Sequence, residues 1–271
     1  MIDSRLGARW VQRENVMRYS GQELYQGLGA LAGQAYIEPD SLVRLEDTRI
    51  HQALLAGGQP ALEVGCGSGQ LLLRWLAEGL AVDGLDLSLE ALGRCLQLAR
   101  ARHLPVSLYW QALQELALPD KYRLIYLPRG TFMHVVERDL AIESLSRLHA
   151  QLEPGGQLLL SVYDQSGFAG AGDLSVDRLA PESGRLHIER RALAVDPVEQ
   201  LITDERRYRL LQGGQVLREE RRVGQFRWYT KLELSMLLAW VGFDDIDIRP
   251  LQLAEADQPG VTLLASARRR S

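Results

Sequence analysis

A short apolar run followed by three alternating glycines constrains the fold more than any other feature of this sequence. The run 61–64 leads into Gly65, Gly67 and Gly69, and the apolar stretch 71–76 follows. This order predicts a strand, a glycine turn and a helix. Glycine lacks Cβ, so its backbone N–H groups can approach a ligand closely, and a helix N-terminus attracts negative charge. The stretch therefore predicts a cradle for a carboxylate or phosphate.

The spacing of these glycines separates two classes of cofactor. A dinucleotide fingerprint requires G-x-G-x-x-G, but here Gln70 occupies the third glycine position and Gly69 comes one residue early. The pattern E-x-G-x-G-x-G, beginning at Glu63, instead resembles the class I S-adenosylmethionine (SAM)-dependent methyltransferases. The resemblance covers about residues 59–163 and is weaker to the C-terminus. It implies SAM as cofactor and S-adenosylhomocysteine (SAH) as product.

From residue 59 onward, apolar strands and helical stretches alternate, which is the pattern of a βαβ fold. We expect an α/β, Rossmann-like, doubly wound sheet of seven mostly parallel strands. The expected strands are 60–64, 80–86, 106–111, 122–127, 158–162, 246–249 and 261–267. The expected helices include 42–56, 69–78, 88–103 and one that begins at a Thr230 cap.

The expected domain organisation has three parts. Residues 41–165 and 230–268 form the SAM-binding core, and residues 1–40 either fold over it as a lid or pack against the sheet edge. Residues 166–229 break the alternation and predict an inserted antiparallel β arm over the acceptor pocket. We expect a loop to about residue 184, then strands at 186–195, 200–211 and 216–227, with a hairpin turn at Gly213-Gly214.

The hairpin turn fixes a predicted register for the two long strands of the arm. It pairs Arg207 with Glu220 and Glu205 with Arg222, both favourable across strands. It also pairs Arg206 with Arg221, which is unfavourable unless an acidic group lies between them. Polar residues on both faces near the middle predict that the arm projects from the body.

The resemblance carries a set of cofactor contacts onto this sequence. Asp86 would accept hydrogen bonds from the ribose hydroxyls, although an aspartate at this place can also cap a helix or loop. Leu87 would face the adenine, Gln111 would accept from its amino group, and the Ala112 backbone N–H would reach a ring nitrogen. Gln111 departs from the aspartate that the family often has there. The full expected set is Glu63, Gly65, Cys66, Gly67, Gly69, Asp86, Leu87, Gln111, Ala112 and Leu127.

Three residues are candidates for binding the methyl acceptor or for catalysis on it. His134, in the loop after the fourth strand, could act as a general base, or it could be structural. Arg129 could bind an acidic acceptor group or pair with the sheet edge. Tyr229, with Arg227 and Trp228, returns from the arm and either lines the pocket or belongs to the core. The loop 127–134 lacks the Asn/Asp-Pro-Pro-Tyr/Phe motif of methyltransferases that act on nucleobases or glutamine.

Composition limits which binding partners and which cellular compartment we expect for this chain. A net charge of −4 gives no bulk reason to bind nucleic acid. The N-terminus lacks a signal peptide, no apolar run is long enough to span a membrane, and Cys66 and Cys95 are placed unfavourably for a disulfide. We therefore expect a cytoplasmic protein. The five dispersed histidines indicate no metal site.

We therefore expect a SAM-dependent methyltransferase that acts on an N or O atom of a small molecule. A methyltransferase that acts on RNA or protein is the first alternative, because the arm is rich in arginine. A SAM-binding module without catalysis is the second, and a nicotinamide enzyme fits least. A homodimer would form if the polar faces of the arm pair between subunits.

Overall fold

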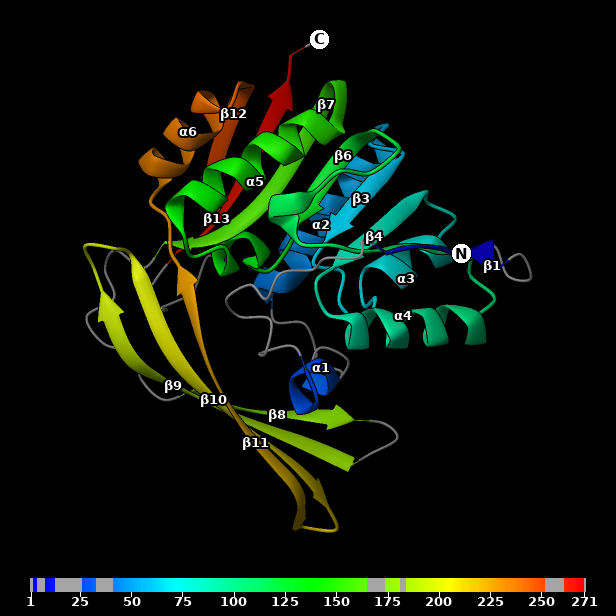
Figure 1. Ribbon diagram of the computed structural model, residues 1–271, viewed down its shortest axis with the longest axis vertical. Coiled ribbons are helices and arrows are strands. Elements are labelled where there is room, and N and C mark those ends of the chain that lie inside the picture. The colour runs from blue at the N-terminus through cyan, green and yellow to red at the C-terminus, as the bar shows by residue number, and fades with distance from the viewer. Residues whose placement is uncertain are drawn as a thin grey trace.

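The computed structural model describes residues 2–3, 8–12, 26–32, 41–164, 174–180, 184–251 and 261–270. Within these ranges the chain forms one large mixed sheet with helices on both faces, and a separate antiparallel sheet that stands away from it (Figure 1). The large sheet contains the expected core, and the second sheet is the expected arm.

The large sheet has nine strands in the order β1-β2-β5-β4-β3-β6-β7-β13-β12. In that order they are Ile2–Asp3, Ala8–Gln12, Ser107–Trp110, Val82–Asp86, Ala61–Val64, Tyr122–Leu127, Leu152–Asp164, Val261–Arg269 and Phe243–Pro250. Each adjacent pair in the run β2-β5-β4-β3-β6-β7 is parallel. The pairs β1–β2, β7–β13 and β13–β12 are antiparallel. The seven predicted strands are therefore confirmed.

Two short N-terminal strands extend the predicted sheet. β2 pairs parallel with β5, at the sheet edge, and helix α1 (Leu28–Ala32) lies against α4 and the arm. The described part of residues 1–40 thus contacts both the sheet edge and the arm. The remainder of the expected lid lies outside the described residues.

Alternation along the central strands divides the core into two layers, because successive side chains of a strand point to opposite faces. Leu62, Ile125 and Leu127 pack with α5 (Arg138–Gln151) and α6 (Lys231–Trp240). On the other face, Ala61 and Leu124 pack with α2 (Ser41–Leu55), α3 (Leu72–Ala77) and α4 (Leu89–Ala101). The central strands are buried on both faces.

The predicted helix caps are present. The Ser88 hydroxyl accepts a hydrogen bond from the Ala91 N–H at 3.2 Å, and the Thr230 hydroxyl accepts one from the Glu233 N–H at 3.3 Å. Each cap satisfies one of the first backbone N–H groups of its helix, which have no partner within the helix.

The arm is a four-stranded antiparallel sheet in the order β11-β10-β9-β8. Its strands are β8 (Leu174–Ala180), β9 (Gly184–Asp196), β10 (Leu201–Gln212) and β11 (Gln215–Arg227). The three long strands and the turn at Gly213-Gly214 are confirmed. The expectation of loop up to residue 184 is wrong in part, because residues 174–180 pair with β9 as a fourth strand.

The predicted register of the β10–β11 hairpin is wrong by one residue. A bulge between Leu210 and Leu211 shifts the pairing, so Arg207 lies opposite Arg221 and Arg206 lies opposite Arg222. A bulge inserts an extra residue into one strand, and nothing in the sequence marks it. The predicted pairs Arg207–Glu220 and Glu205–Arg222 are consequently not cross-strand partners.

Candidate functional site

The carboxyl ends of β3 and β6 meet where the strand order reverses. From β3 the chain passes to β4 and β5 on one side of the sheet, and then returns to β6 on the other side of β3. Ligands of open α/β sheets bind outside the carboxyl ends of the strands at such a point. Here the glycine turn follows β3, and the short helix η3 (Thr131–His134) follows β6.

The glycine turn and η3 are in close contact. A Cβ at Gly65 would lie 2.5 Å from Cγ2 of Thr131, and one at Gly69 would lie 2.5 Å from Sγ of Cys95. Gly65, Gly67 and Gly69 all have positive φ, at 78°, 54° and 86°. Glycine is therefore required at Gly65 and Gly69 by both conformation and packing.

Gly67 differs from its two neighbours in the turn. Among the residues that the structure describes, no heavy atom lies within 4 Å of the position that its Cβ would occupy. Its missing side chain therefore faces open space beside the strand ends, which leaves room for a ligand against the backbone. Cys66, by contrast, is buried, and its sulfur lies beneath the turn against Gly84.

Asp86 ties the second strand to the glycine turn. Its Oδ2 accepts a hydrogen bond from the Gly67 N–H at 2.8 Å, and its Oδ1 accepts one from the Ser88 N–H at 2.7 Å. Burial raises the pKa of this carboxyl, while the backbone N–H groups oppose the rise. Asp86 therefore lies at the predicted place, directly beside Gly67.

Glu63 is buried beneath the turn on the α2–α3 side of the sheet. Its Oε2 accepts a hydrogen bond from the Tyr126 hydroxyl at 2.8 Å. Burial raises the pKa of Glu63 to about 8, a rise that the Tyr126 hydrogen bond and the charge of Arg129 oppose. A carboxyl in this position holds its proton at neutral pH unless a cation approaches it.

The side chains expected around the adenine follow β4, β5 and β6. The Leu87 carbonyl accepts a hydrogen bond from the Trp110 indole at 3.0 Å, which joins the ends of β4 and β5. The Gln111 carboxamide oxygen accepts from the Ala117 N–H at 3.1 Å. Ala112 and Leu127 are fully buried. The Gln111 oxygen thus already has one partner in the chain and can accept one more hydrogen bond.

Arg129 adopts a left-handed conformation, with φ 57°, at the turn after β6. Its N–H donates to Oε1 of Glu46 at 3.0 Å, and its guanidinium contacts Asp47 at 3.4 Å and the Gln70 side chain at 3.3 Å. Burial raises the pKa of both acidic groups, and Arg129 opposes that rise. Arg129 therefore joins α2 to the glycine turn, on the cofactor side of the site.

His134 ends η3 and is oriented toward the arm. Burial lowers its pKa to about 4, and the positive charges of Arg206 and Arg190 lower it further, while Asp204 opposes them. The ring is therefore neutral at physiological pH. It can accept a proton, but only weakly.

Tyr229 brings the root of the arm against η3. Its ring stacks on Phe132 with 5.2 Å between centroids, and its N–H donates to the Tyr163 carbonyl at 3.4 Å. The phenol is buried, its oxygen has no hydrogen-bond partner among the described residues, and burial raises its pKa. Of the three predicted acceptor residues, His134 and Tyr229 thus belong to the same strand-end region.

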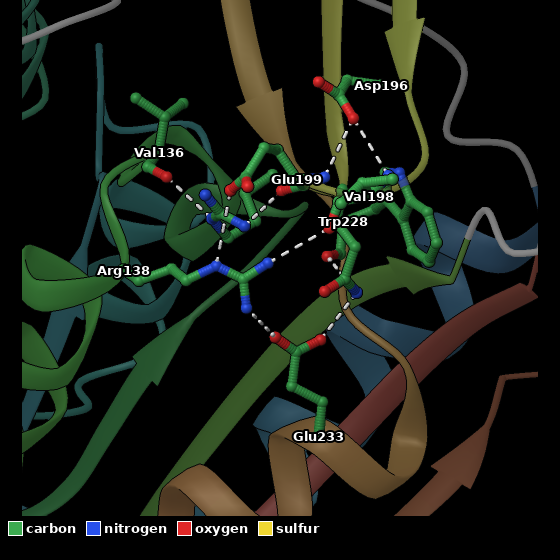
Figure 2. Close-up of polar contacts among 9 residues, drawn as sticks. Val136, Arg138, Asp196, Val198, Glu199, Trp228 and Glu233 are labelled. Atoms are coloured by element: carbon green, nitrogen blue, oxygen red, sulfur yellow. Dashed lines mark hydrogen bonds and ion pairs between the residues drawn. The ribbon is translucent and has the colours of Figure 1, made fainter.

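A polar network fixes the root of the arm to the core, and Figure 2 shows its members around Arg138. The Arg138 guanidinium lies 3.7 Å from both Glu199 and Glu233. Arg227 is buried, its Nε donates to the Val136 carbonyl at 2.7 Å, and another guanidinium nitrogen donates to the Glu199 carbonyl. Arg227 therefore has a structural role here.

Several residues of this region have no marker in the sequence. Thr131, Tyr126 and Glu46 reach the glycine turn, β3 and Arg129 from distant parts of the chain. Only the order of strands in the sheet brings them there, and no local motif records it. No cluster of three or more metal-binding side chains occurs within the part of the chain that the structure describes.

The residues present fit SAM. The N–H groups of Gly65, Gly67 and Gly69 already donate within the chain, so the predicted cradle of N–H groups is not open to an anion at these residues. Gly67 leaves open space for a ligand, and the Asp86 carboxyl beside it would accept from the ribose hydroxyls. Glu63 supplies a buried carboxyl beneath a turn that would receive a sulfonium and an ammonium. None of the described helices is long and apolar enough to cross a membrane.

Comparison with known proteins agrees with this geometry. Residues 61–156 match the family model described as a methyltransferase domain. A methyltransferase of Geobacillus sp. (strain WCH70) is 28% identical over 107 residues, which are 40% of this chain and 43% of that protein. The matched segment thus spans less than half the length of the curated relatives.

Solved structures cover almost the whole chain at lower identity. The sugar N-methyltransferase KedS8 from Streptoalloteichus sp. ATCC 53650 has a TM-score of 0.68 at 15% identity, covering 96% of this chain and 98% of that one. SAM-bound CalS10, an amino pentose methyltransferase from Micromonospora echinaspora, has a TM-score of 0.61 at 19% identity, covering 95% and 100%. The fold, including the arm, is therefore shared with these proteins.

Proposed function

We propose that this chain, which carries a class I SAM-dependent methyltransferase domain, transfers a methyl group from SAM to an N or O atom of a small-molecule acceptor. The observation that carries the proposal is the glycine turn at the strand-order reversal. Its central residue, Gly67, faces open space and donates its N–H to Asp86. That open space lies beside Asp86, at the position where the ribose of a nucleoside cofactor would bind.

The cofactor would be held by chain groups that already lie together. The backbone of Gly65, Gly67 and Gly69 would face its methionine part, Asp86 its ribose, and Leu87, Gln111 and Ala112 its adenine. When bound, SAM supplies an electrophilic methyl group. Glu63 and Arg129, below and beside the turn, would balance the charges of the methionine part.

The acceptor would lie between the strand ends and the root of the arm. Methyl transfer is an in-line displacement, so the chief task of the chain is to hold the acceptor close and aligned. His134, which is partly exposed at the end of η3, would orient the acceptor there, and the buried Phe132–Tyr229 stack would support it from behind.

The environment of His134 favours an amine acceptor over a hydroxyl. A general base works best when its pKa is near the working pH, and the pKa of His134 is lowered to about 4. A neutral amine attacks without prior loss of a proton and releases it afterwards, so a weak base is sufficient. The names of KedS8 and CalS10, a sugar N-methyltransferase and an amino pentose methyltransferase, support an amino sugar as the first acceptor to test.

The outer face of the arm gives little support to RNA as the acceptor. Its arginines are paired with glutamates: Arg207 with Glu219 at 2.8 Å, and Arg209 with Glu189. Such pairing reduces the positive potential that phosphate binding requires.

Thermal denaturation with SAM, SAH and NAD tests the cofactor assignment. SAM and SAH should raise the melting temperature by binding the native state, and NAD should not. Asp86→Asn should reduce SAM affinity about tenfold, as expected for weakened hydrogen bonds to a charged acceptor. Stabilisation by NAD alone would disprove the assignment. SAH release measured over a panel of amines and alcohols then tests the acceptor, and release with alcohols alone would contradict the preference for nitrogen.

A further inference from the structure

The arm presents one face to the core, and the residues on that face follow from the strand register. On β10 the residues Ile202, Asp204, Arg206, Tyr208 and Leu210 share one face, because side chains alternate along a strand. Ile202 is part of the main core, whereas Tyr208 and Leu210 pack with α1. This inner face is therefore apolar at both ends and polar in the middle.

Three arginines cross the polar middle of the inner face in a single row. Arg206 on β10 lies directly opposite Arg190 on β9 and Arg222 on β11. Directly opposed side chains of neighbouring strands are close, and like charges in such positions are destabilising. A row of three therefore requires acidic partners close to it.

The carboxylates that offset this charge lie beneath the guanidinium groups. Asp204 is 0% exposed; one of its oxygens contacts Arg190, and the same oxygen lies 3.2 Å from Arg206. Glu220, 9% exposed, contacts Arg222 at 3.0 Å and accepts a hydrogen bond from the Leu28 N–H at 3.1 Å.

The three guanidinium side chains are more accessible than their acidic partners. Arg190, Arg206 and Arg222 are 38%, 19% and 29% exposed. Arg190 is also held over the ring of Phe226, at 4.6 Å from its centroid. The surface that the middle of the inner face presents is thus made of guanidinium groups, already oriented by buried carboxylates.

The row lies on the acceptor side of the molecule. η3 contacts β11, and Arg190, Asp204 and Arg206 are near enough to His134 for their charges to act on its ring. Neighbouring strands are about 4.8 Å apart, so three adjacent arginines form a row roughly 10 Å long.

We propose that Arg190, Arg206 and Arg222 form an anion subsite that anchors the acceptor through a phosphate or carboxylate group, away from the atom that is methylated. The inference rests on the proposed function, because it places the rest of the same acceptor. Arginine suits this task, since its planar group donates two parallel hydrogen bonds to either oxyanion. The acceptors of this chain are accordingly anionic small molecules.

Calorimetry on the full chain saturated with SAH tests the subsite directly. Inorganic pyrophosphate and malonate serve as probes, the first for a phosphate group and the second for a carboxylate group. The probe that binds more tightly identifies which of these groups the acceptor carries. We expect binding that weakens with salt, and that falls about tenfold in Arg206→Gln and in Arg222→Gln, as expected for loss of one charge-assisted contact. Arg222→Gln leaves the buried Asp204 with both of its partners, and Glu220 keeps its contacts with Arg218 and the Leu28 N–H, so the fold should be intact.

Arg207→Gln is the matched control, since it alters the next residue of β10, on the outer face, opposite Arg221. Pyrophosphate and malonate affinity should be unchanged in it. Absence of binding by both probes, or equal weakening in Arg207→Gln, would overturn the subsite.

SAH affinity of the same proteins separates this inference from the proposed function. If SAH binds normally while neither anion does, only the subsite fails. If SAH does not bind to the unaltered chain, the proposed function fails first. A methylation assay with amino sugars and their 1-phosphates gives a second measure: a phosphate should lower KM in the unaltered chain, and it should lower KM about tenfold less in Arg222→Gln.

Discussion

The glycine turn and the arm hold their charges in opposite ways. At the turn, single carboxyl groups are buried and meet uncharged donors: Asp86 accepts from backbone N–H groups and Glu63 from a tyrosine hydroxyl. On the arm, carboxylates and guanidinium groups are interleaved, and most remain partly exposed. Under the proposed function, the turn would receive the positive charges of the cofactor, and the inner face of the arm would receive a negative charge of the acceptor.

The proposed function and the proposed subsite place the two substrates in different regions: SAM at the turn and the acceptor at the arm. SAM brings a sulfonium and an ammonium, which suit the buried acids of the turn. The acceptor would carry the phosphate or carboxylate group that the row of Arg190, Arg206 and Arg222 binds. Variants of each region should therefore alter one binding event and leave the other unchanged, and the predictions below test that independence in order of decreasing effect.

Arg227→Ala should have the largest effect on stability. The buried side chain donates to the carbonyls of Val136 and Glu199, and hydrogen bonds from a charged donor contribute about 1.5–3 kcal/mol each. Chemical denaturation should show a loss of roughly 3 kcal/mol or more. Because the arm root would separate from η3, turnover should be lost while SAM affinity is retained.

Arg221→Ala is the control for this change, since Arg221 lies on the exposed outer face of β11. Its stability and turnover should match those of the unaltered chain. If Arg227→Ala weakened SAM binding as strongly as it reduced turnover, the two regions would not be independent.

Glu63→Gln should change how stability depends on pH. The folded chain raises the pKa of Glu63 from 4.5 to about 8, so it holds this proton more tightly than the unfolded chain does. The resulting stabilisation is complete below about pH 4.5 and is lost as the pH rises through 8. Each pKa unit corresponds to 1.36 kcal/mol, so the total is of the order of a few kcal/mol.

Glutamine imitates the protonated acid and can still accept from Tyr126. Melting temperatures of the ligand-free variant should therefore equal those of the unaltered chain near pH 5 and exceed them near pH 8. Glu153 pairs with Arg123 on the surface, so the melting temperature of Glu153→Gln should differ from that of the unaltered chain by the same small amount at both pH values. A parallel pH profile for Glu63→Gln would mean that the acid is ionised in the fold.

Gly67→Ala should separate conformational strain from loss of the cofactor site. Gly67 and Gly79 both have positive φ, and both have open space where a Cβ would lie. Alanine in that conformation costs about 1–2 kcal/mol at either position, so the two variants should melt alike. Only at Gly67 would the new methyl occupy the cradle, and SAM affinity measured by calorimetry should fall about tenfold or more there. Equal SAM affinity in Gly67→Ala and Gly79→Ala would show that the open space at Gly67 is not part of the SAM site.

The sequence predicted the glycine-turn region well because its information is local. Glu63, Gly65, Gly67 and Gly69 lie within one short stretch, and Asp86 follows at the next strand end. The alternation of strands and helices also predicted a parallel sheet, in which the carboxyl ends of the strands lie at one edge. The partners from elsewhere, such as Thr131 against Gly65 and Glu46 against Arg129, depend on sheet order and have no local signature.

The arm was predicted less completely, for the same reason. Its strands and its Gly213-Gly214 turn were evident, but the bulge at Leu210 and Leu211 was not. A slip of one residue moves every side chain of a strand to the opposite face. The row of Arg190, Arg206 and Arg222 therefore became visible only with the observed register.

Shortening the arm tip should have the smallest effect and tests that register. Replacing residues 211–217 by Asn-Gly removes the bulge and joins Leu210 to Arg218, which are already cross-strand partners, through a turn that suits a two-residue hairpin. The removed Val216 and Leu217 are exposed, whereas Leu210 packs against the α1 cluster and is kept. SAM affinity, turnover and pyrophosphate affinity should all be unchanged. Loss of pyrophosphate affinity alone would show that the bulge sets the register of the arginine row, and loss of turnover together with a smaller mass in solution would show that the tip joins two subunits.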